Sequence, residues 1–228
     1  MFIDRKDAGK QLTEKLIPYK SQEPLVIALP RGGVAVGFPI AKEFKIALEM
    51  IMVRKIGAPQ NPELGIGAIA EGNVLFWDTD MLDIVQIPNH DLVALYEKES
   101  AELARRIDSY RRGKQLPLLT NKTIILVDDG LATGVSAHAA LLSLKRHHPK
   151  KIIFALPVCS GETALSIRQL VDKVICLESS DNMESIGRYY ENFEQVTDDT
   201  VMTLIKKTKN RLYDMEVTEN NFSHKIVW

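Results

Sequence analysis

Apolar and polar residues alternate along this chain in blocks that predict strands and helices in turn. Short unbroken apolar runs predict buried strands, and apolar residues spaced about three to four apart predict helices with one buried face. The predicted strands are residues 24–30, 47–53, 123–127, 151–158 and 173–177, and the predicted helices are residues 7–16, 34–44, 91–112, 135–147, 162–170 and 198–212. Because strands that alternate with helices form βαβ units, the pattern predicts an α/β fold with a mostly parallel, twisted sheet flanked by helices.

Two segments depart from this alternation. Residues 54–80 are rich in glycine and carry only short apolar runs, which predicts a hairpin or a flexible flap. With the helix that follows, this segment predicts a flap or hood insertion at about residues 55–115, within a domain that spans residues 1–213. Residues 214–228 show no strong period and are predicted to form a C-terminal tail.

The amino-acid composition excludes several classes of function. The chain has 228 residues, 45% of them hydrophobic and 26% charged, which suits one compact domain. Its net charge is −1 and no basic stripe occurs, so nucleic acid is not expected as the main partner. The two cysteines fit neither a disulfide framework nor a zinc site, and no apolar signal core or membrane-spanning run of ~20 residues is present. We therefore expect a cytoplasmic protein with no membrane partner.

Two adjacent carboxylates follow the predicted strand 123–127. Ligands of parallel sheets bind beyond the carboxyl ends of the strands, where Asp128 and Asp129 lie. The loop after them leads into a helix N-terminus, whose free N–H groups favour a phosphate. This loop consists of Gly130, Leu131, Ala132, Thr133, Gly134, Val135 and Ser136. The pattern indicates a sugar phosphate ligand, whereas the alternative is an acidic pair that only caps the next helix.

The stretch Ile124-Ile-Leu-Val-Asp-Asp-Gly-Leu-Ala-Thr-Gly134 resembles the signature of the type I phosphoribosyltransferases. In that family an apolar strand is followed by two acidic residues, then by small or apolar residues and Thr-Gly. The resemblance implies that Asp128 and Asp129 are catalytic and hold the ribose hydroxyls of phosphoribosyl pyrophosphate, directly and through Mg²⁺, as the metal ligands. It also implies that residues 132–136 surround the 5′-phosphate.

A second stretch, Leu29-Pro-Arg-Gly-Gly-Val34, resembles the pyrophosphate loop of the same family. A pyrophosphate leaving group requires hydrogen-bond donors whose interactions strengthen as its charge develops. The Arg31 side chain, a third catalytic candidate, and the N–H groups of Gly32 and Gly33 are such donors. The alternative is an ordinary turn between a strand and a helix.

Four further stretches resemble a subgroup of this family with an unassigned acceptor. They are Phe2-Ile-Asp-Arg-Lys-Asp-Ala-Gly9, Val53-Arg-Lys-Ile-Gly-Ala-Pro59, Asn61-Pro-Glu-Leu-Gly-Ile-Gly-Ala68 and Gly187-Arg-Tyr-Tyr-Glu-Asn-Phe193. The resemblance covers about residues 2–212. It implies that a small nucleobase-like acceptor displaces pyrophosphate from ribose C1, with positioning and charge stabilisation as the means of catalysis. A homodimer is a possible assembly, because dimers are common in this fold.

Further binding candidates follow other predicted strands. Arg54 and Lys55 lie where the family often places a basic residue toward pyrophosphate, although a structural role is equally compatible with their position. Tyr189 and Tyr190 lie near the place where purine members stack an aromatic ring on the base. Core packing is an equal alternative for these tyrosines.

The acceptor and its acid–base group stay open. Members of the family that act on 6-oxopurines carry an aspartate where this chain has Ala132, which disfavours hypoxanthine and guanine as acceptors. Glu63 and Glu71 are acidic candidates near the flap, but each is expected to be a solvated surface residue, and Arg111 is expected at a solvated helix end. The alternative function is a non-catalytic sensor of phosphoribosyl pyrophosphate or of a nucleotide. The Arg31–Gly32 pair favours the enzyme, because a sensor does not need to release pyrophosphate.

Replacing Arg31 with alanine is expected to weaken pyrophosphate binding, because it removes a charged donor from the predicted loop. Isothermal titration of the purified variant with inorganic pyrophosphate measures this. A variant that loses only thermal stability, with unchanged affinity, would show that Arg31 is structural.

Overall fold

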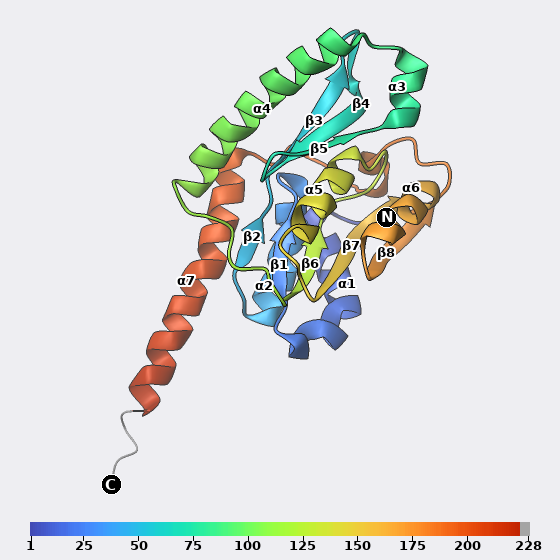
Figure 1. Ribbon diagram of the computed structural model, residues 1–228. Coiled ribbons are helices and arrows are strands. Elements are labelled where there is room, and N and C mark those ends of the chain that lie inside the picture. Colours follow the sequence, from blue (N-terminus) through green and yellow to red (C-terminus); the bar gives the residue numbers. More distant parts are fainter. Residues whose placement is uncertain (224–228) are drawn as a thin grey trace.

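A five-stranded parallel sheet forms the centre of the molecule (Figure 1). Its strands are β1 (Leu25–Ala28), β2 (Leu48–Met50), β6 (Thr123–Val127), β7 (Lys151–Ser160) and β8 (Lys173–Ser180), in the spatial order β2-β1-β6-β7-β8. All neighbouring strands in this sheet are parallel. The computed structural model describes residues 1–223, with residues 211–223 described as helical backbone only. The predicted α/β fold with a parallel sheet is confirmed.

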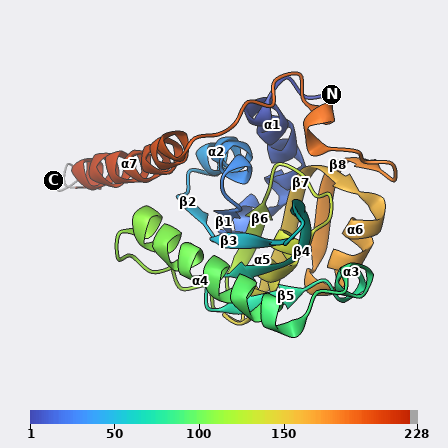
Figure 2. The same ribbon diagram turned by 90° about the horizontal axis from the view of Figure 1, so that it is seen from above.

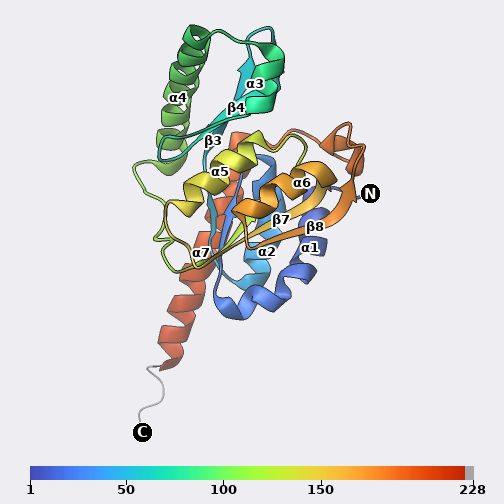
Figure 3. The ribbon, with the colours of Figure 1, turned by 45° about the vertical axis from the view of Figure 1, so that its right-hand side comes forward.

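Helices cover both faces of this sheet (Figures 2 and 3). They are α1 (Arg5–Leu16), α2 (Gly32–Phe44) and α7 (Asp198–Ser223) on one face, and α5 (Val135–Lys145) and α6 (Gly161–Ile167) on the other. Short 3-10 helices span Ile17–Gln22, Arg168–Leu170 and Ile186–Tyr189. Along β1, Val26 and Ala28 pack under the first group of helices, and Ile27 packs under the second. Because successive side chains of a strand point to opposite faces, burial of both faces requires the unbroken apolar runs seen in the sequence.

The order of the strands places a change of winding direction in the interior of the sheet. From β1 the chain moves outward to β2, whereas from β6 it moves in the opposite direction through β7 to β8. β1 and β6 are neighbours, so the winding direction changes between them. In open α/β sheets the carboxyl ends of two such strands form the ligand-binding crevice.

Residues 53–111 form a second unit, which we call the hood. It contains an antiparallel sheet of β3 (Val53–Ala58), β4 (Asn61–Ala70) and β5 (Val74–Trp77), followed by α3 (Thr79–Val85) and α4 (Asn89–Arg111). Figures 1 and 3 show the hood at one end of the molecule, next to α5. There the Phe76 ring stacks on the His138 ring of α5, with 4.6 Å between centroids. The hairpin predicted for this region is present, and its action as a mobile flap stays a prediction.

A buried ion pair joins the hood to the central sheet. Arg111, at the end of α4, donates from Nη2 to Glu71 Oε1 at 2.8 Å and to the Met50 carbonyl at 2.6 Å. The same Glu71 oxygen accepts from the Met52 N–H at 2.8 Å, and the Glu71 carbonyl accepts from the Ser143 hydroxyl at 2.7 Å. The expectation that Glu71 and Arg111 are solvated was wrong, since their side chains are only 11% and 6% exposed.

The main departures from the predicted pattern lie at one strand and two helices. The predicted strand 47–53 is divided, because β2 ends at Met50 in the central sheet and β3 begins at Val53 in the hood. Helix α3 was not predicted. Helix α7 continues to Ser223, past the predicted end at residue 212, and Figure 1 shows its C-terminal part projecting from the body. The predicted tail is therefore helical up to Ser223, and residues 224–228 lie outside the described residues.

Within residues 1–223, every helix is too short or too polar to cross a membrane. The cytoplasmic location stays a prediction.

Replacing Arg111 with alanine is expected to lower the free energy of unfolding by about 3–5 kcal/mol, because it leaves the Glu71 carboxylate buried without its cation. Urea unfolding measures the change. Arg188→Ala is the matched control, because its partner Glu184 and Arg188 itself are each 67% exposed, and exposed pairs contribute about 0–1 kcal/mol. Equal losses in the two variants would contradict a structural role for the buried pair.

Candidate active site

The acidic pair and the Arg31–Gly33 turn meet at the change of winding direction. Asp128 and Asp129 follow β6, and the turn follows β1, the neighbouring strand. A backbone hydrogen bond from the Leu29 N–H to the Val127 carbonyl, at 2.9 Å, extends the pairing to the start of both loops. The structure thus brings the two sequence motifs into one crevice, although nearly a hundred residues separate them in the chain.

Glycine is required where these two loops touch. A Cβ atom on Gly32 would lie 1.8 Å from Asp129 Oδ2, and one on Gly33 would lie 2.6 Å from the Val127 carbonyl oxygen and 2.9 Å from the Asp128 Cα. Real Cβ atoms do not approach other atoms so closely. The backbone of the turn therefore lies directly against the carboxylates.

Two helices begin at this crevice, and their N-termini differ from those of the other helices. Helix α2 begins at Gly32 and α5 begins at Val135, and neither has an acidic residue in its first turn. Every other α-helix in residues 1–223 has at least one. Because first-turn carboxylates offset the positive end of the helix dipole, α2 and α5 keep N–H groups and positive potential available for an anion.

The loop before α5 is fixed to β7 by backbone hydrogen bonds, and its Thr133 side chain is exposed. The Leu131 N–H donates to the Val158 carbonyl at 3.0 Å, and the Ser160 N–H donates back to the Leu131 carbonyl at 2.8 Å. Gly134 has a φ of 77° and its missing Cβ would lie 2.5 Å from the Thr163 side chain, so only glycine fits there. Thr133 is exposed at the top of the loop, where its hydroxyl can reach a ligand.

The carboxylates of the pair have different environments. Asp128 Oδ1 accepts from the Asp129 N–H at 2.9 Å, and burial, followed by the charge of Asp129, raises the pKa of Asp128 well above its ordinary value. Asp129 Oδ2 instead accepts from Arg5 Nε at 2.7 Å. The Arg5 cation beside Asp129 thus offsets part of the repulsion between the two adjacent carboxyl groups.

The carboxylate oxygens of Asp128 and Asp129 suit a magnesium ion that binds together with a phosphate ligand. Within residues 1–223 no group of three or more His, Cys, Asp and Glu side chains is placed to hold a metal. Two neighbouring carboxylates at a helix-rich phosphate site are nevertheless the usual protein contribution to Mg²⁺, which takes its other oxygens from phosphates and water. Asp128 and Asp129 fit this mode, and they do not fit an all-protein cage.

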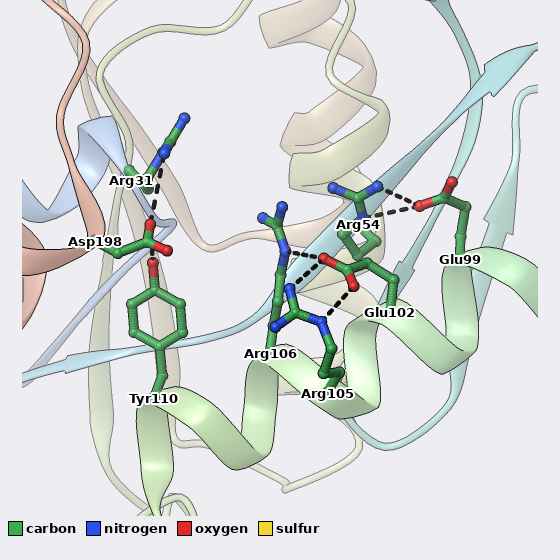
Figure 4. Close-up of polar contacts among 8 residues, drawn as sticks. All are labelled: Arg31, Arg54, Glu99, Glu102, Arg105, Arg106, Tyr110 and Asp198. Atoms are coloured by element: carbon green, nitrogen blue, oxygen red, sulfur yellow. Dashed lines mark hydrogen bonds and ion pairs between the residues drawn. The ribbon is translucent and has the colours of Figure 1, made fainter.

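Arg31 is engaged by a residue from the far end of the chain (Figure 4). Its Nη1 lies 3.5 Å from Asp198 Oδ1, at the start of α7, and the same oxygen accepts from the Tyr110 hydroxyl of α4 at 2.5 Å. Burial and then Asp198 raise the pKa of Tyr110 to about 12, which keeps this hydroxyl a donor. The Arg31 side chain is 37% exposed, so an incoming anion can compete with Asp198 for it.

The structure places the other basic candidates in the hood (Figure 4). Arg54 donates from Nε to Glu99 Oε2 at 2.8 Å, which ties β3 to α4. Lys55 donates to the Glu63 carbonyl at 2.8 Å. It also lies near the α5 N-terminus, because the Cβ position of Gly65 is 3.0 Å from both the Lys55 and the Val135 side chains. Glu63 itself is almost fully exposed, as expected.

Tyr190 and Tyr189 differ in their surroundings. Tyr190 is buried, its ring contacts Phe2 and Phe193, and its hydroxyl donates to the Asp129 carbonyl at 2.6 Å. Burial raises the pKa of Tyr190, so the hydroxyl stays protonated. This packing favours the core alternative for Tyr190, whereas Tyr189 is half-buried.

Three residues of the site escaped the sequence analysis: Arg5, Tyr110 and Asp198. Each acts through a partner that is distant in sequence, since Arg5 is 124 positions from Asp129 and Tyr110 is 88 positions from Asp198. The one available signal was for Arg5, which lies inside the Phe2–Gly9 stretch that resembles the family subgroup.

Comparisons with known proteins give a family match and several similar proteins. The family model described as "Phosphoribosyl transferase domain" matches residues 3–194. Proteins named "Putative phosphoribosyl transferase" from two strains of Mycobacterium tuberculosis are 35% identical over 207 residues, covering 91% of this chain and 47% of theirs. The chain thus spans about half the length of these relatives. The crystal structure of TT1426 from Thermus thermophilus is 33% identical, has a TM-score of 0.74, and covers 90% of this chain and 97% of its own.

Asp128→Asn is expected to make the ligand-free protein more stable at neutral pH. A carboxyl whose folded pKa is raised disfavours the folded state once the unfolded chain ionises, so the cost is absent below the ordinary aspartate pKa of about 3.9 and grows as the pH rises above it. Thermal unfolding of both proteins from pH 4 to about pH 8 measures this. A variant that is less stable throughout would contradict the raised pKa.

Proposed function

The chain belongs to the family with the phosphoribosyl transferase domain, and from that premise we propose that it transfers a phosphoribosyl group between phosphoribosyl pyrophosphate and a nucleobase-like acceptor, with Mg²⁺ and with release of pyrophosphate. The observation that carries this proposal is the contact between the acidic pair after β6 and the Arg31–Gly33 turn after β1. A donor of this kind has a diol next to a pyrophosphate, and the crevice offers carboxylates next to cationic and N–H donors.

In the proposed reaction the bond between ribose C1 and the pyrophosphate oxygen breaks, and its electron pair leaves with pyrophosphate. A bond forms between C1 and an acceptor nitrogen, which gives up a proton. Arg31 and the N–H groups of Gly32 and Gly33 stabilise the charge that develops on pyrophosphate, because donors fixed in place beforehand need no rearrangement as that charge grows. No protein nucleophile is needed, since positioning and charge stabilisation are sufficient.

The acidic pair and the loop before α5 hold the ribose end of the donor in this proposal. The carboxylates of Asp128 and Asp129 accept hydrogen bonds from the ribose hydroxyls. The 5′-phosphate lies at residues 132–136, where the α5 N-terminus supplies N–H groups and Thr133 and Ser136 supply hydroxyls. When bound, Mg²⁺ would neutralise charge on pyrophosphate and hydroxyl oxygens, with Asp128 and Asp129 as its protein ligands.

In this proposal the acceptor binds between the hood and the start of α5. Gly65 of β4 lies against Val135, so the hood closes over the start of α5. A cavity of about 390 Å³ between β3, β4 and α4 is lined in part by Arg54, Lys55 and Lys98. Glu63 and Glu99 line the same cavity, and Arg54 is paired with Glu99, so the lining is of mixed charge and leaves the chemistry of the acceptor open.

A thermal-shift titration with phosphoribosyl pyrophosphate, with and without Mg²⁺, tests the donor site. At ~100 times its dissociation constant the ligand is expected to stabilise the folded protein by about 2.7 kcal/mol, and the shift is expected to depend on Mg²⁺. The double variant Asp128→Asn/Asp129→Asn is expected to lose it. Asp80→Asn/Asp83→Asn is the matched control, because it removes the same charge from an exposed face of α3.

Two outcomes decide between the candidate functions. A shift that is retained by the double variant at residues 128 and 129 would refute the site. A Mg²⁺-dependent shift in wild type, combined with no release of pyrophosphate from phosphoribosyl pyrophosphate in the presence of any nucleobase of an acceptor screen, would favour the sensor over the enzyme.

A further inference from the structure

The two terminal stretches of the resemblance pack against each other beside the acidic pair. The Phe2 N–H donates to the Tyr189 carbonyl at 2.7 Å, and the Glu191 N–H donates to the Phe2 carbonyl at 2.8 Å. The Asn192 N–H donates to the Ile3 carbonyl at 2.9 Å, which continues the pairing toward Arg5. The function proposed above assigns no role to this assembly, although it lies in contact with the site.

Arg5 is held in this assembly from three directions. Its Nε donates to Asp129 Oδ2 at 2.7 Å, and its Nη1 donates to the Glu194 carbonyl at 2.7 Å. Its guanidinium lies over the Phe193 ring, with 3.7 Å between Cζ and the ring centroid. A planar guanidinium with this many fixed partners loses little further freedom when it pairs with a carboxylate.

The pair between Arg5 and Asp129 differs from the surface ion pairs of the protein. Its side chains are 12% and 15% exposed, whereas Glu184 and Arg188 are each 67% exposed. Water and salt therefore screen the Arg5–Asp129 pair much less. The Cβ position of Gly32 lies 3.0 Å from Arg5 Nε as well as 1.8 Å from Asp129 Oδ2, so the pair rests directly on the pyrophosphate turn.

A carboxylate oxygen in a charge-assisted hydrogen bond competes poorly as a metal ligand. The Arg5 Nε hydrogen bond occupies one acceptor site of Asp129 Oδ2, and its positive charge opposes a divalent cation at the same carboxylate because the two cations repel each other. The sugar pyrophosphate brings further negative oxygens, which offset that repulsion. The order of binding therefore depends on Arg5.

We propose that Arg5 is a built-in counter-ion for Asp129, which keeps a divalent cation out of the ligand-free site and so makes cation binding depend on the sugar pyrophosphate. This inference rests on the proposed function, because it assumes that Asp129 is part of the donor site. Arg5 acts through Asp129 and is a positioning residue.

The test measures binding of Mn²⁺ to the free protein by electron paramagnetic resonance, with Mn²⁺ as the probe because oxygen sites that take Mg²⁺ also take Mn²⁺. Wild type is expected to bind Mn²⁺ weakly without phosphoribosyl pyrophosphate. Arg5→Met is expected to bind it at least about tenfold tighter under the same conditions. Adding Asp129→Asn to Arg5→Met is expected to abolish the gain.

Lys6→Met is the matched control, because Lys6 is the exposed neighbour of Arg5 and the change removes the same charge. It is expected to bind Mn²⁺ as wild type does, which separates the specific pair from the general potential of the surface. Equal Mn²⁺ affinity in folded Arg5→Met and wild type would overturn the proposal, as would an equal gain in Lys6→Met.

If Arg5→Met does not fold, Phe193→Leu takes its place, because it removes the ring from the guanidinium and keeps both charges. It is expected to tighten Mn²⁺ binding by about twofold to fivefold, the range of a lost cation–π contact. An unchanged affinity would overturn the proposal.

Failure of the proposed function and failure of this inference give different results. If phosphoribosyl pyrophosphate does not stabilise wild type, the proposed function is contradicted. If it stabilises wild type but Arg5 has no effect on Mn²⁺ binding, this inference alone is contradicted.

Discussion

The turn after β1 and the carboxylates after β6 approach so closely that a single added carbon at position 32 would overlap the Asp129 side chain. This contact constrains much of the surrounding structure. It accompanies the parallel pairing of β1 with β6, and it excludes a side chain at Gly33 in the first turn of α2, where an added carbon would meet the backbone of Val127 and Asp128. The winding of the sheet changes direction at the same place, so one constraint produces both the crevice and the convergence of unlike charges within it.

The charges of Asp129 and Arg31 are each paired with a residue of opposite charge from a helix that flanks the central sheet. Arg5 of α1 pairs with Asp129, and Asp198 of α7 pairs with Arg31. Helices near the two ends of the described chain thus supply a cation to the acidic side of the crevice and an anion to its basic side. Such pairs stabilise a concentration of charge that the fold alone would disfavour, and they set the competition that any ligand must meet.

The hood depends on a third ion pair of a different character. Glu71 and Arg111 are buried together and also bind backbone groups of the connection between β2 and β3, so they fix where the hood begins and ends relative to the sheet. The pairs at Arg31 and Arg54 are more exposed and can exchange partners, whereas this one cannot do so without leaving a charge in the core.

The local sequence pattern was sufficient to predict much of the fold and the candidate site. The strand at residues 123–127 matches β6 at both ends, and the acidic pair, the glycine turn and the loop before α5 were all recognised, because each depends on neighbours within a few residues. The sequence by itself therefore determined the α/β class and the candidate donor site. Only the tertiary structure decided that Glu71 and Arg111 are buried, that Tyr190 packs in the core, and that Arg5 and Asp198 reach the crevice. These outcomes depend on contacts between residues 40 to 167 positions apart, such as Glu71–Arg111 and Arg31–Asp198, and the periodicity of a single helix or strand carries no information about its distant partners.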